Sequence, residues 1–201
     1  MKRGKPLTTD FQKRLVKSVD IWQFDISPTQ KSEPFLRQVL AHYLSEQNLV
    51  IERGEFGKPF LVNFSQWQFN VSHSDKKLLI AVSFEMPVGI DVEQIKFRRL
   101  LSDLVKKCFA FSEQTYWFSL SENEQTESFY DFWTRKEAVV KGIGRGIAIG
   151  LNRCEINVNA PNQFLNLPVV EKWFTQKIDV SPDYCAALAT PFANVIVQFC
   201  N

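Results

Sequence analysis

Two acidic residues at alternate positions of one short segment could hold a divalent cation. In residues 88–93 (VGIDVE) apolar and acidic side chains alternate, which predicts a strand with Asp91 and Glu93 on the same face. Their Cα atoms would lie about 6 to 7 Å apart, so the two charges repel unless a cation lies between them. Carboxylate oxygens suit Mg²⁺. The same alternation is typical of an amphipathic strand with one face in solvent, and the pair alone leaves both interpretations open.

A third carboxylate and a lysine lie on a predicted helix. Trp133, Glu137 and Lys141 recur at intervals of four residues, which would place them as a ridge along one helix face. A glutamate followed four residues later by a lysine is also the favoured order for an ordinary surface ion pair. The glycine-rich exit of this helix, residues 142–146, matches neither a Walker loop nor a dinucleotide-binding loop.

Short polar side chains end another predicted strand and could present hydrogen-bond donors to a phosphate. They occupy residues 69–75 (FNVSHSD) and surround His73. The alternative is a Ser/Asp turn with an exposed histidine, because such residues favour turns and a lone histidine has no specific meaning.

The elements that must position these residues are short strands interspersed with a few helices. Apolar positions at helical spacing predict helices over residues 32–47, 97–109 and 127–141, the last ending at glycines. Alternating or apolar runs predict strands over residues 20–26, 67–72, 78–84, 88–93, 155–158, 169–174, 185–189 and 195–199. Residues 52–59 are expected to form a loop. Because the helices and strands do not alternate strictly, we expect an α+β fold rather than a doubly wound parallel sheet.

The composition is that of one continuous globular body. The chain has 201 residues, of which 45% are hydrophobic and 23% charged, enough to bury a core. A net charge of +2 does not indicate nucleic-acid binding. The basic start is followed by residues 6–10 instead of an apolar segment, so we expect no secretory signal, and no apolar run is long enough to span a membrane. The cysteines lack C-x-x-C spacing, so we expect reduced thiols and a cytoplasmic location.

Four blocks in order along the chain resemble the signatures of the 4'-phosphopantetheinyl transferases of the surfactin-synthetase-activating type. They are residues 57–59 (GKP), 69–74 (FNVSHS), 89–93 (GIDVE) and 133–141 (WTRKEAVVK). The resemblance covers roughly residues 50–150. It implies a monomer made of two similar α+β halves related by a pseudo-twofold axis, with residues 1–95 as the N-terminal half and 96–201 as the C-terminal half.

The resemblance also implies an activity, that of a holo-[acyl-carrier-protein] synthase. Such an enzyme transfers the phosphopantetheine arm of coenzyme A to a serine of an apo acyl or peptidyl carrier protein and releases 3',5'-ADP. By position, Asp91, Glu93 and Glu137 would hold Mg²⁺, and Glu137 and Lys141 would be catalytic. The resemblance assigns the binding of coenzyme A to the following residues: Lys58, Ser72, His73, Lys141, Lys31 and Arg37.

One departure from the family pattern concerns the 3'-phosphate of coenzyme A. Relatives carry a basic stretch before and within the first helix, whereas residues 27–33 contain little charge, so Lys31 and Arg37 are the nearest candidates. The basic helix expected over residues 96–107 would dock the acidic carrier protein. Two other functions remain open from the residues: a different metal-dependent phosphoryl-transfer enzyme, and a non-catalytic carrier-protein-binding module.

Overall fold

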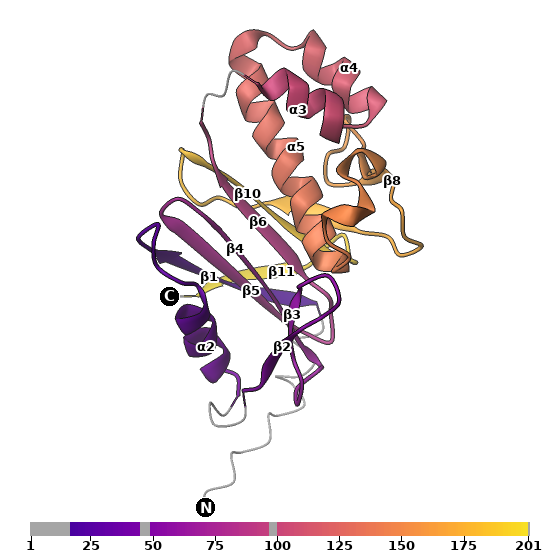
Figure 1. The fold of residues 1–201 in the computed structure, drawn as a ribbon. Helices are drawn as coiled ribbons and strands as arrows, with labels where there is room; N and C mark the ends of the chain where they lie inside the picture. Colours follow the sequence, from indigo (N-terminus) through magenta and orange to yellow (C-terminus); the bar gives the residue numbers. More distant parts are fainter. Residues whose placement is uncertain (1–16, 45–48, 97–99, 201) are drawn as a thin grey trace, which may run out of the picture.

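The computed structural model describes residues 17–44, 49–96 and 100–200. Its two larger sheets meet along one edge, and one long helix crosses the second of them (Figure 1). The chain is mixed α+β, as the element pattern predicts. The pseudo-twofold relation between two halves stays a prediction.

The larger sheet has four strands in the order β11-β1-β5-β4. Their bounds are Ile196–Cys200 for β11, Ser18–Asp25 for β1, Lys77–Phe84 for β5 and Trp67–Ser74 for β4. The β5 strand is antiparallel to both β1 and β4, while β11 runs parallel to β1. Alternation in β1 sends Trp22 to one face, against the helix α2 (Glu33–Ala41), and Val19 and Ile21 to the other.

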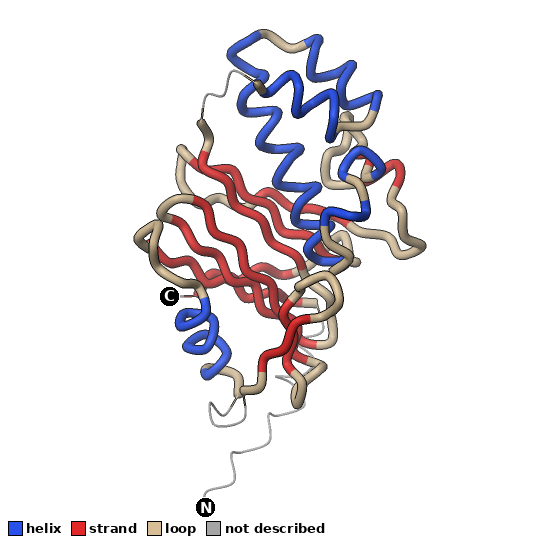
Figure 2. Tube along the Cα trace, in the orientation of Figure 1, coloured by secondary structure: helices blue, strands red, loops and turns tan. Residues whose placement is uncertain are grey.

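The smaller sheet has three strands in the order β6-β10-β9, all antiparallel neighbours. They span Gly89–Gln94, Tyr184–Thr190 and Phe174–Lys177 respectively. The helix α5 (Glu122–Ile143) lies across one face of β6 and β10, as Figures 1 and 2 show. The other face of β6 and β10 packs its apolar residues on Val19 and Ile21 of the larger sheet. A buried layer therefore joins the two sheets.

Two short helices sit at the N-terminal end of α5, at the end of the molecule far from α2 (Figure 1). They are α3 (Leu101–Cys108) and α4 (Phe111–Ser119). Glu113 of α4 and Lys136 of α5 form an ion pair of 2.6 Å, with both side chains 0% exposed. The Lys136 ammonium also donates to the carbonyls of Leu151 and Cys154, so this buried charge has several partners.

The remaining strands are short and form two separate two-stranded sheets. The hairpin of β2 (Ile51–Arg53) and β3 (Pro59–Leu61) occupies the segment expected as a loop. A second pair, β7 (Glu155–Ile156) and β8 (Phe164–Asn166), follows the 3-10 turns η2 (Ile147–Ile149) and η3 (Leu151–Arg153).

Several boundaries differ from the sequence-based prediction. The first helix ends at Ala41 rather than near residue 47, and residues 45–48 lie outside the described part. The basic helix begins at Leu101 rather than at residue 96 or 97, and residues 97–99 are also outside. The helix α5 begins at Glu122, five residues before the predicted start, because Glu124 accepts the backbone N–H of Ser121 and so caps its first turn. The strand expected over residues 169–174 is wrong, since β9 begins at Phe174.

Two further observations concern the whole chain. The strand β6 lies before the expected division at residue 95 yet pairs with β10, and β11 returns to pair with β1, while the division itself stays a prediction. In the part of the chain that the structure describes, no helix is long and apolar enough to cross a membrane.

Candidate active site

The face of β6 that carries Asp91 and Glu93 is covered by protein. The strand neighbours of these residues on β10, Ala187 and Cys185, belong to clusters that pack against α5. Asp91 is only 3% exposed. The interpretation of this strand face as a solvent face is therefore wrong for Asp91, and the carboxylates project toward the helix that carries Glu137.

The close approach of β6 to α5 depends on two glycines. A Cβ atom at Gly89 would lie 1.9 Å from the carbonyl oxygen of Ala138 and 2.5 Å from the backbone nitrogen of Gly142. A Cβ atom at Gly142 would lie 2.5 Å from the Trp173 ring. Only glycine at both positions lets strand and helix backbones meet here. This crossing brings Lys141 within reach of Asp91.

Asp91 is held by one charge and one hydroxyl. The Lys141 ammonium lies 2.5 Å from Asp91 Oδ1, which also accepts a hydrogen bond of 2.9 Å from Ser72 Oγ. Burial raises the pKa of Asp91, while Lys141 and then Ser72 act in the opposite direction. The second oxygen, Oδ2, is buried and has no hydrogen-bond partner among the described residues.

Side chains of β4 bind the free edge of β6. The Asn70 Oδ1 accepts the backbone N–H of Ile90 at 2.8 Å. The hydroxyls of Ser72 and Ser74 accept the backbone N–H groups two and four residues further along β6, at 3.2 and 3.1 Å. Ser74 Oγ also donates to Glu93 Oε2 at 2.9 Å. These contacts connect the edges of the two sheets.

The carboxylate of Glu137 is repelled by the negative charges of Asp91 and Glu93. Burial raises the pKa of Glu137 to about 7; the negative charges of Asp91 and Glu93 contribute to the increase, and the Lys141 ammonium opposes it. Three carboxylates from β6 and α5 thus lie within electrostatic range of one another and of one ammonium group.

The residues of this cluster fit a divalent metal ion in their chemistry. Three carboxylates that repel one another are a donor set for a hard cation, and one of them has a buried oxygen that no donor of the described residues satisfies. Among the described residues no three His, Cys, Asp or Glu side chains already stand in coordinating positions. The Lys141 ammonium occupies the space beside Asp91 Oδ1, so ligation at that oxygen would require the Lys141 side chain to move.

Lys58 joins the β2-β3 hairpin to the end of α5. Its ammonium donates to the carbonyl oxygen of Gly142 at 2.7 Å and to that of Val88 at 3.2 Å. It thereby satisfies a carbonyl in the last turn of α5, which is capped by Gly144 in the left-handed conformation with φ of 78°. Burial lowers the pKa of Lys58 to about 8.

The other residues expected to bind coenzyme A lie apart from the acidic cluster or face away from it. His73 follows Ser72 on β4 and is exposed, since neighbouring strand residues point to opposite faces. Lys31 and Arg37 line a hollow of about 560 Å³ on α2, whose described lining includes no residue of the acidic cluster. Arg37 is bonded there to Glu33 and to the carbonyl of Leu49. Trp133 packs in the core and stacks on Phe129.

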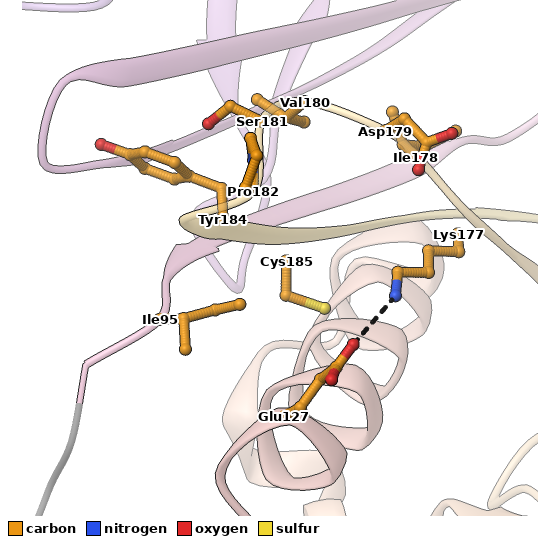
Figure 3. A pocket seen from close by; sticks show the side chains of 10 residues that line it. All are labelled: Ile95, Glu127, Lys177, Ile178, Asp179, Val180, Ser181, Pro182, Tyr184 and Cys185. Atoms are coloured by element: carbon orange, nitrogen blue, oxygen red, sulfur yellow. Dashed lines mark ion pairs between the residues drawn. The ribbon is translucent and has the colours of Figure 1, made fainter. Parts of the chain in front are cut away.

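A cavity of about 410 Å³ lies beside the end of β6 (Figure 3). Ile95, two residues after Glu93, lines it, and Cys185 points from β10 toward α5, near the exposed ion pair of Glu127 and Lys177. None of the three carboxylates lines this cavity. The candidate site is therefore defined by the charge cluster and not by this cavity.

Comparison with known proteins agrees with this geometry. Residues 87–189, half of the chain, match the model of the 4'-phosphopantetheinyl transferase superfamily. The chain belongs to this superfamily. The matched stretch includes β6 and α5, and therefore Asp91, Glu93, Glu137 and Lys141.

Individual members of the superfamily resemble the chain over different lengths. It is 36% identical over 129 residues to the 4'-phosphopantetheinyl transferase gsp of Aneurinibacillus migulanus, a stretch of 63% of the chain and about half (52%) of gsp. It is 27% identical over 171 residues to the 4'-phosphopantetheinyl transferase Sfp of Bacillus subtilis, covering 81% of the chain and 75% of Sfp. Identity to the 4'-phosphopantetheinyl transferase HetI of Nostoc is 32% over 157 residues, covering 76% and 65%.

Sequence reasoning missed the residues that organise this superfamily site. Asn70 and Ser74 lie inside the block of residues 69–74, but no role was assigned to them from the sequence. They stand two residues before and two residues after Ser72, which places all three side chains on one face of β4. The glycines at 89 and 142 lie within or beside the quoted blocks as well. Nothing in the sequence could have indicated that they touch, because 53 positions separate them.

Proposed function

We propose that this chain transfers the 4'-phosphopantetheine group of coenzyme A to a serine of an apo carrier protein and releases 3',5'-ADP. The observation that carries the proposal is the cluster of Asp91, Glu93, Glu137 and Lys141 inside the region that matches the transferase superfamily. The named activity of gsp, Sfp and HetI supports it. Monomeric state and cytoplasmic location, expected from the sequence, are part of this proposal.

The carboxylates of Asp91, Glu93 and Glu137 would hold Mg²⁺. When bound, the ion supplies positive charge next to the pyrophosphate of coenzyme A and offsets the negative charge that develops there. Lys141, whose ammonium already lies 2.5 Å from Asp91, would donate to a phosphate oxygen at the same place.

The chemical step forms a bond between the carrier serine oxygen and the β-phosphorus, which bears the pantetheine arm. The bond from that phosphorus to the oxygen bridging it to the α-phosphorus breaks, and 3',5'-ADP leaves with the electron pair. The serine proton passes to Glu137 or to a water that Glu137 holds. Without bound metal, burial raises the pKa of Glu137 to about 7, so its carboxylate is a stronger base than that of an ordinary glutamate.

The remaining contacts to coenzyme A are proposed for basic and polar side chains outside the cluster. Lys58 and His73 would bind the nucleotide end and its 3'-phosphate, with Lys31 and Arg37 as further candidate cations. Ser72 would support them indirectly, since its single proton and both lone pairs are already engaged by Asp91, Val92 and Lys141.

The carrier protein would dock on the surface that includes residues 96–107. Lys106 and Lys107 are exposed on the last turn of α3, and the segment follows the strand that carries Glu93. Arg98 and Arg99 belong to the same expected surface but lie outside the described residues. Carrier proteins present acidic surface near their serine, so a basic patch would guide the encounter.

The direct test is magnesium-dependent transfer of a labelled pantetheine arm from coenzyme A to an apo acyl or peptidyl carrier protein, followed by mass spectrometry of the carrier. We expect an added phosphopantetheine mass on one serine, and none with Glu137→Gln or with a carrier that lacks that serine. Coenzyme A with Mg²⁺ should also raise the melting temperature of the protein. Absence of transfer with several carrier classes, together with no thermal shift, would refute the proposal.

A further inference from the structure

The contact between β4 and β6 is made by side chains where a continuous sheet would use backbone groups. The two strands belong to different sheets, yet Asn70, Ser72 and Ser74 of β4 accept the N–H groups of Ile90, Val92 and Gln94 in turn. Both sets advance by two residues, so one face of β4 follows the edge of β6 in register. These three residues are called the β4 ladder below.

Two members of the ladder make an additional contact that the third lacks. Ser72 Oγ donates to Asp91 Oδ1 and Ser74 Oγ donates to Glu93 Oε2, each at 2.9 Å. Asn70 accepts the backbone N–H of Ile90 and, among the described residues, makes no hydrogen bond to a carboxylate. Each serine hydroxyl therefore links a backbone N–H of β6 to the carboxylate of the residue immediately before that N–H.

This arrangement restricts the carboxylates more than a single hydrogen bond would. The hydroxyl cannot follow a rotating carboxylate without losing its own bond to the backbone of β6. An O–H group that accepts an N–H is also polarised and becomes a stronger donor to the carboxylate. One oxygen of Asp91 and one of Glu93 are thereby fixed relative to the same strand edge, while Asp91 Oδ2 keeps no protein partner among the described residues.

We propose that Ser72 and Ser74 are positioning residues that orient Asp91 and Glu93 for a divalent cation, in addition to joining the two sheets. The inference rests on the proposed function for the identity of the cation as Mg²⁺. Ser74 would thus orient Glu93, although the proposed reaction itself gives Ser74 no part. The inference also predicts a difference between two kinds of ladder residue, since only the serines contact the ligands.

The experiment compares Ser74→Ala with Asn70→Ala, which removes a ladder contact of the same kind without touching a carboxylate. Mn²⁺ binding is measured by electron paramagnetic resonance, first with the metal alone and then with saturating coenzyme A. Outer contacts to metal ligands change affinity by about 10- to 100-fold. We expect Ser74→Ala to weaken Mn²⁺ binding by about 10-fold, and Asn70→Ala to change it by less than about twofold while lowering the melting temperature.

Two further variants keep the test independent of folding and of catalysis. Ser74→Thr retains the hydroxyl and should restore Mn²⁺ affinity, whereas Ser74→Cys, with a weak donor of similar size, should not. In transfer assays, Ser74→Ala should raise the magnesium concentration needed for half-maximal rate and leave the rate at saturating magnesium within about threefold. Mn²⁺ binding that depends on Ser74 in a protein that transfers nothing would support the inference and refute the proposed function.

Three results would overturn the inference. The first is an unchanged Mn²⁺ affinity in both Ser74→Ala and Ser74→Cys. The second is a loss of Mn²⁺ affinity in Asn70→Ala equal to that in Ser74→Ala. The third is wild-type protein that binds no Mn²⁺ with or without coenzyme A. The second result would show that the ladder acts only through the stability of the contact between the sheets.

Discussion

At the scale of single residues, the site combines groups that are unfavourable alone. Asp91 is buried beside an ammonium, Glu137 lies near two other carboxylates, and Ser72 uses all its hydrogen-bonding capacity inside the protein. Such clusters of perturbed acidic groups are typical of functional sites, because folding alone would not favour them. Their energetic consequences can be measured without substrate.

The raised pKa of Glu137 predicts a pH-dependent stability. Its folded pKa of about 7 lies above the ordinary value of 4.5, so the folded state binds the proton more tightly. The stability from this group is fully present below pH 4.5 and is lost as the pH rises through 7. Glu137→Gln should remove this decrease in metal-free melting temperature, whereas the exposed Glu127→Gln on the same helix should retain it.

A transfer rate reduced by less than about 10-fold in Glu137→Gln would argue against its catalytic role.

Lys141 should matter for both stability and transfer. Lys141→Ala leaves Asp91 buried without its counter-charge, which should cost about 2 to 4 kcal/mol in urea unfolding at neutral pH. Transfer at saturating magnesium should fall by about 100- to 1,000-fold, since a group that donates to the developing charge is lost. Mg²⁺ should restore part of the lost stability by pairing with Asp91. Full stability without metal would contradict the contact described here.

At the scale of elements, the decisive contact is the crossing of β6 over α5. The sequence places two glycines where the backbones meet, and the ladder residues hold the opposite edge of the strand. A second contact, the buried Glu113–Lys136 pair, ties α4 to α5 one residue before Glu137. The glycine crossing sets how closely α5 approaches β6, the ladder holds β6 on β4, and the ion pair holds α4 on α5.

Gly89→Ala should disrupt the crossing. The added Cβ would lie 1.9 Å from a carbonyl oxygen of α5, so strand and helix must separate. We expect a loss of about 3 kcal/mol or more in the free energy of unfolding, with lower metal affinity. Gly54→Ala is the matched control, because its nearest neighbour would be 3.7 Å away, and it should stay within about 0.5 kcal/mol of wild type. Equal effects at both positions would exclude the steric explanation.

The buried ion pair should show strong coupling. Lys136→Met leaves the Glu113 carboxylate buried and unpaired and should cost about 3 to 5 kcal/mol, while adding Glu113→Gln should recover part of this loss. The exposed pair Lys177–Glu127 should contribute less than about 1 kcal/mol in the same double-mutant cycle. Additive effects of the two buried substitutions would show that the pair does not act as a unit.

At the scale of the whole molecule, the proposed reaction needs three partners to meet at one place. Coenzyme A, the metal and the carrier serine would come together beside β6 and the C-terminal half of α5. The segment that leads from β6 into α3 starts next to this place and ends in exposed lysines. Two apolar residues that flank α3 in the sequence, Leu100 and Phe111, are also exposed, and Phe111 is 84% exposed.

Charge reversal on this surface should affect the carrier protein and not coenzyme A. Lys106→Glu with Lys107→Glu, or Arg98→Glu with Arg99→Glu, should raise the KM for carrier protein about 10-fold or more and weaken the dependence of rate on salt. Lys17→Glu with Lys172→Glu makes the same change in net charge elsewhere and should have little effect. A KM for carrier that stays at the wild-type value in both pairs would place docking on another surface.

Local features of this protein could be predicted from its sequence. Alternation in residues 88–93 correctly predicted a strand with Asp91 and Glu93 on one face, and glycine after the ridge of Trp133, Glu137 and Lys141 correctly predicted the end of α5. The sequence also indicated the superfamily, and two of the four blocks, residues 89–93 and 133–141, lie in the stretch that matches the superfamily model. These features depend on the geometry of a few consecutive residues, which local spacing encodes directly.

What those strand and helix faces touch depends on how distant elements pack. Alternation shows which side chains share a face but not what covers it, so the burial of Asp91 and the pKa of Glu137 could not be predicted. The links from Ser72 and Ser74 to residues 19 positions away, and the Gly89–Gly142 crossing, arise when separate elements pack. Burial, charge proximity and backbone clearance are properties of that packing, and they make a row of acidic residues into a candidate site for a metal ion.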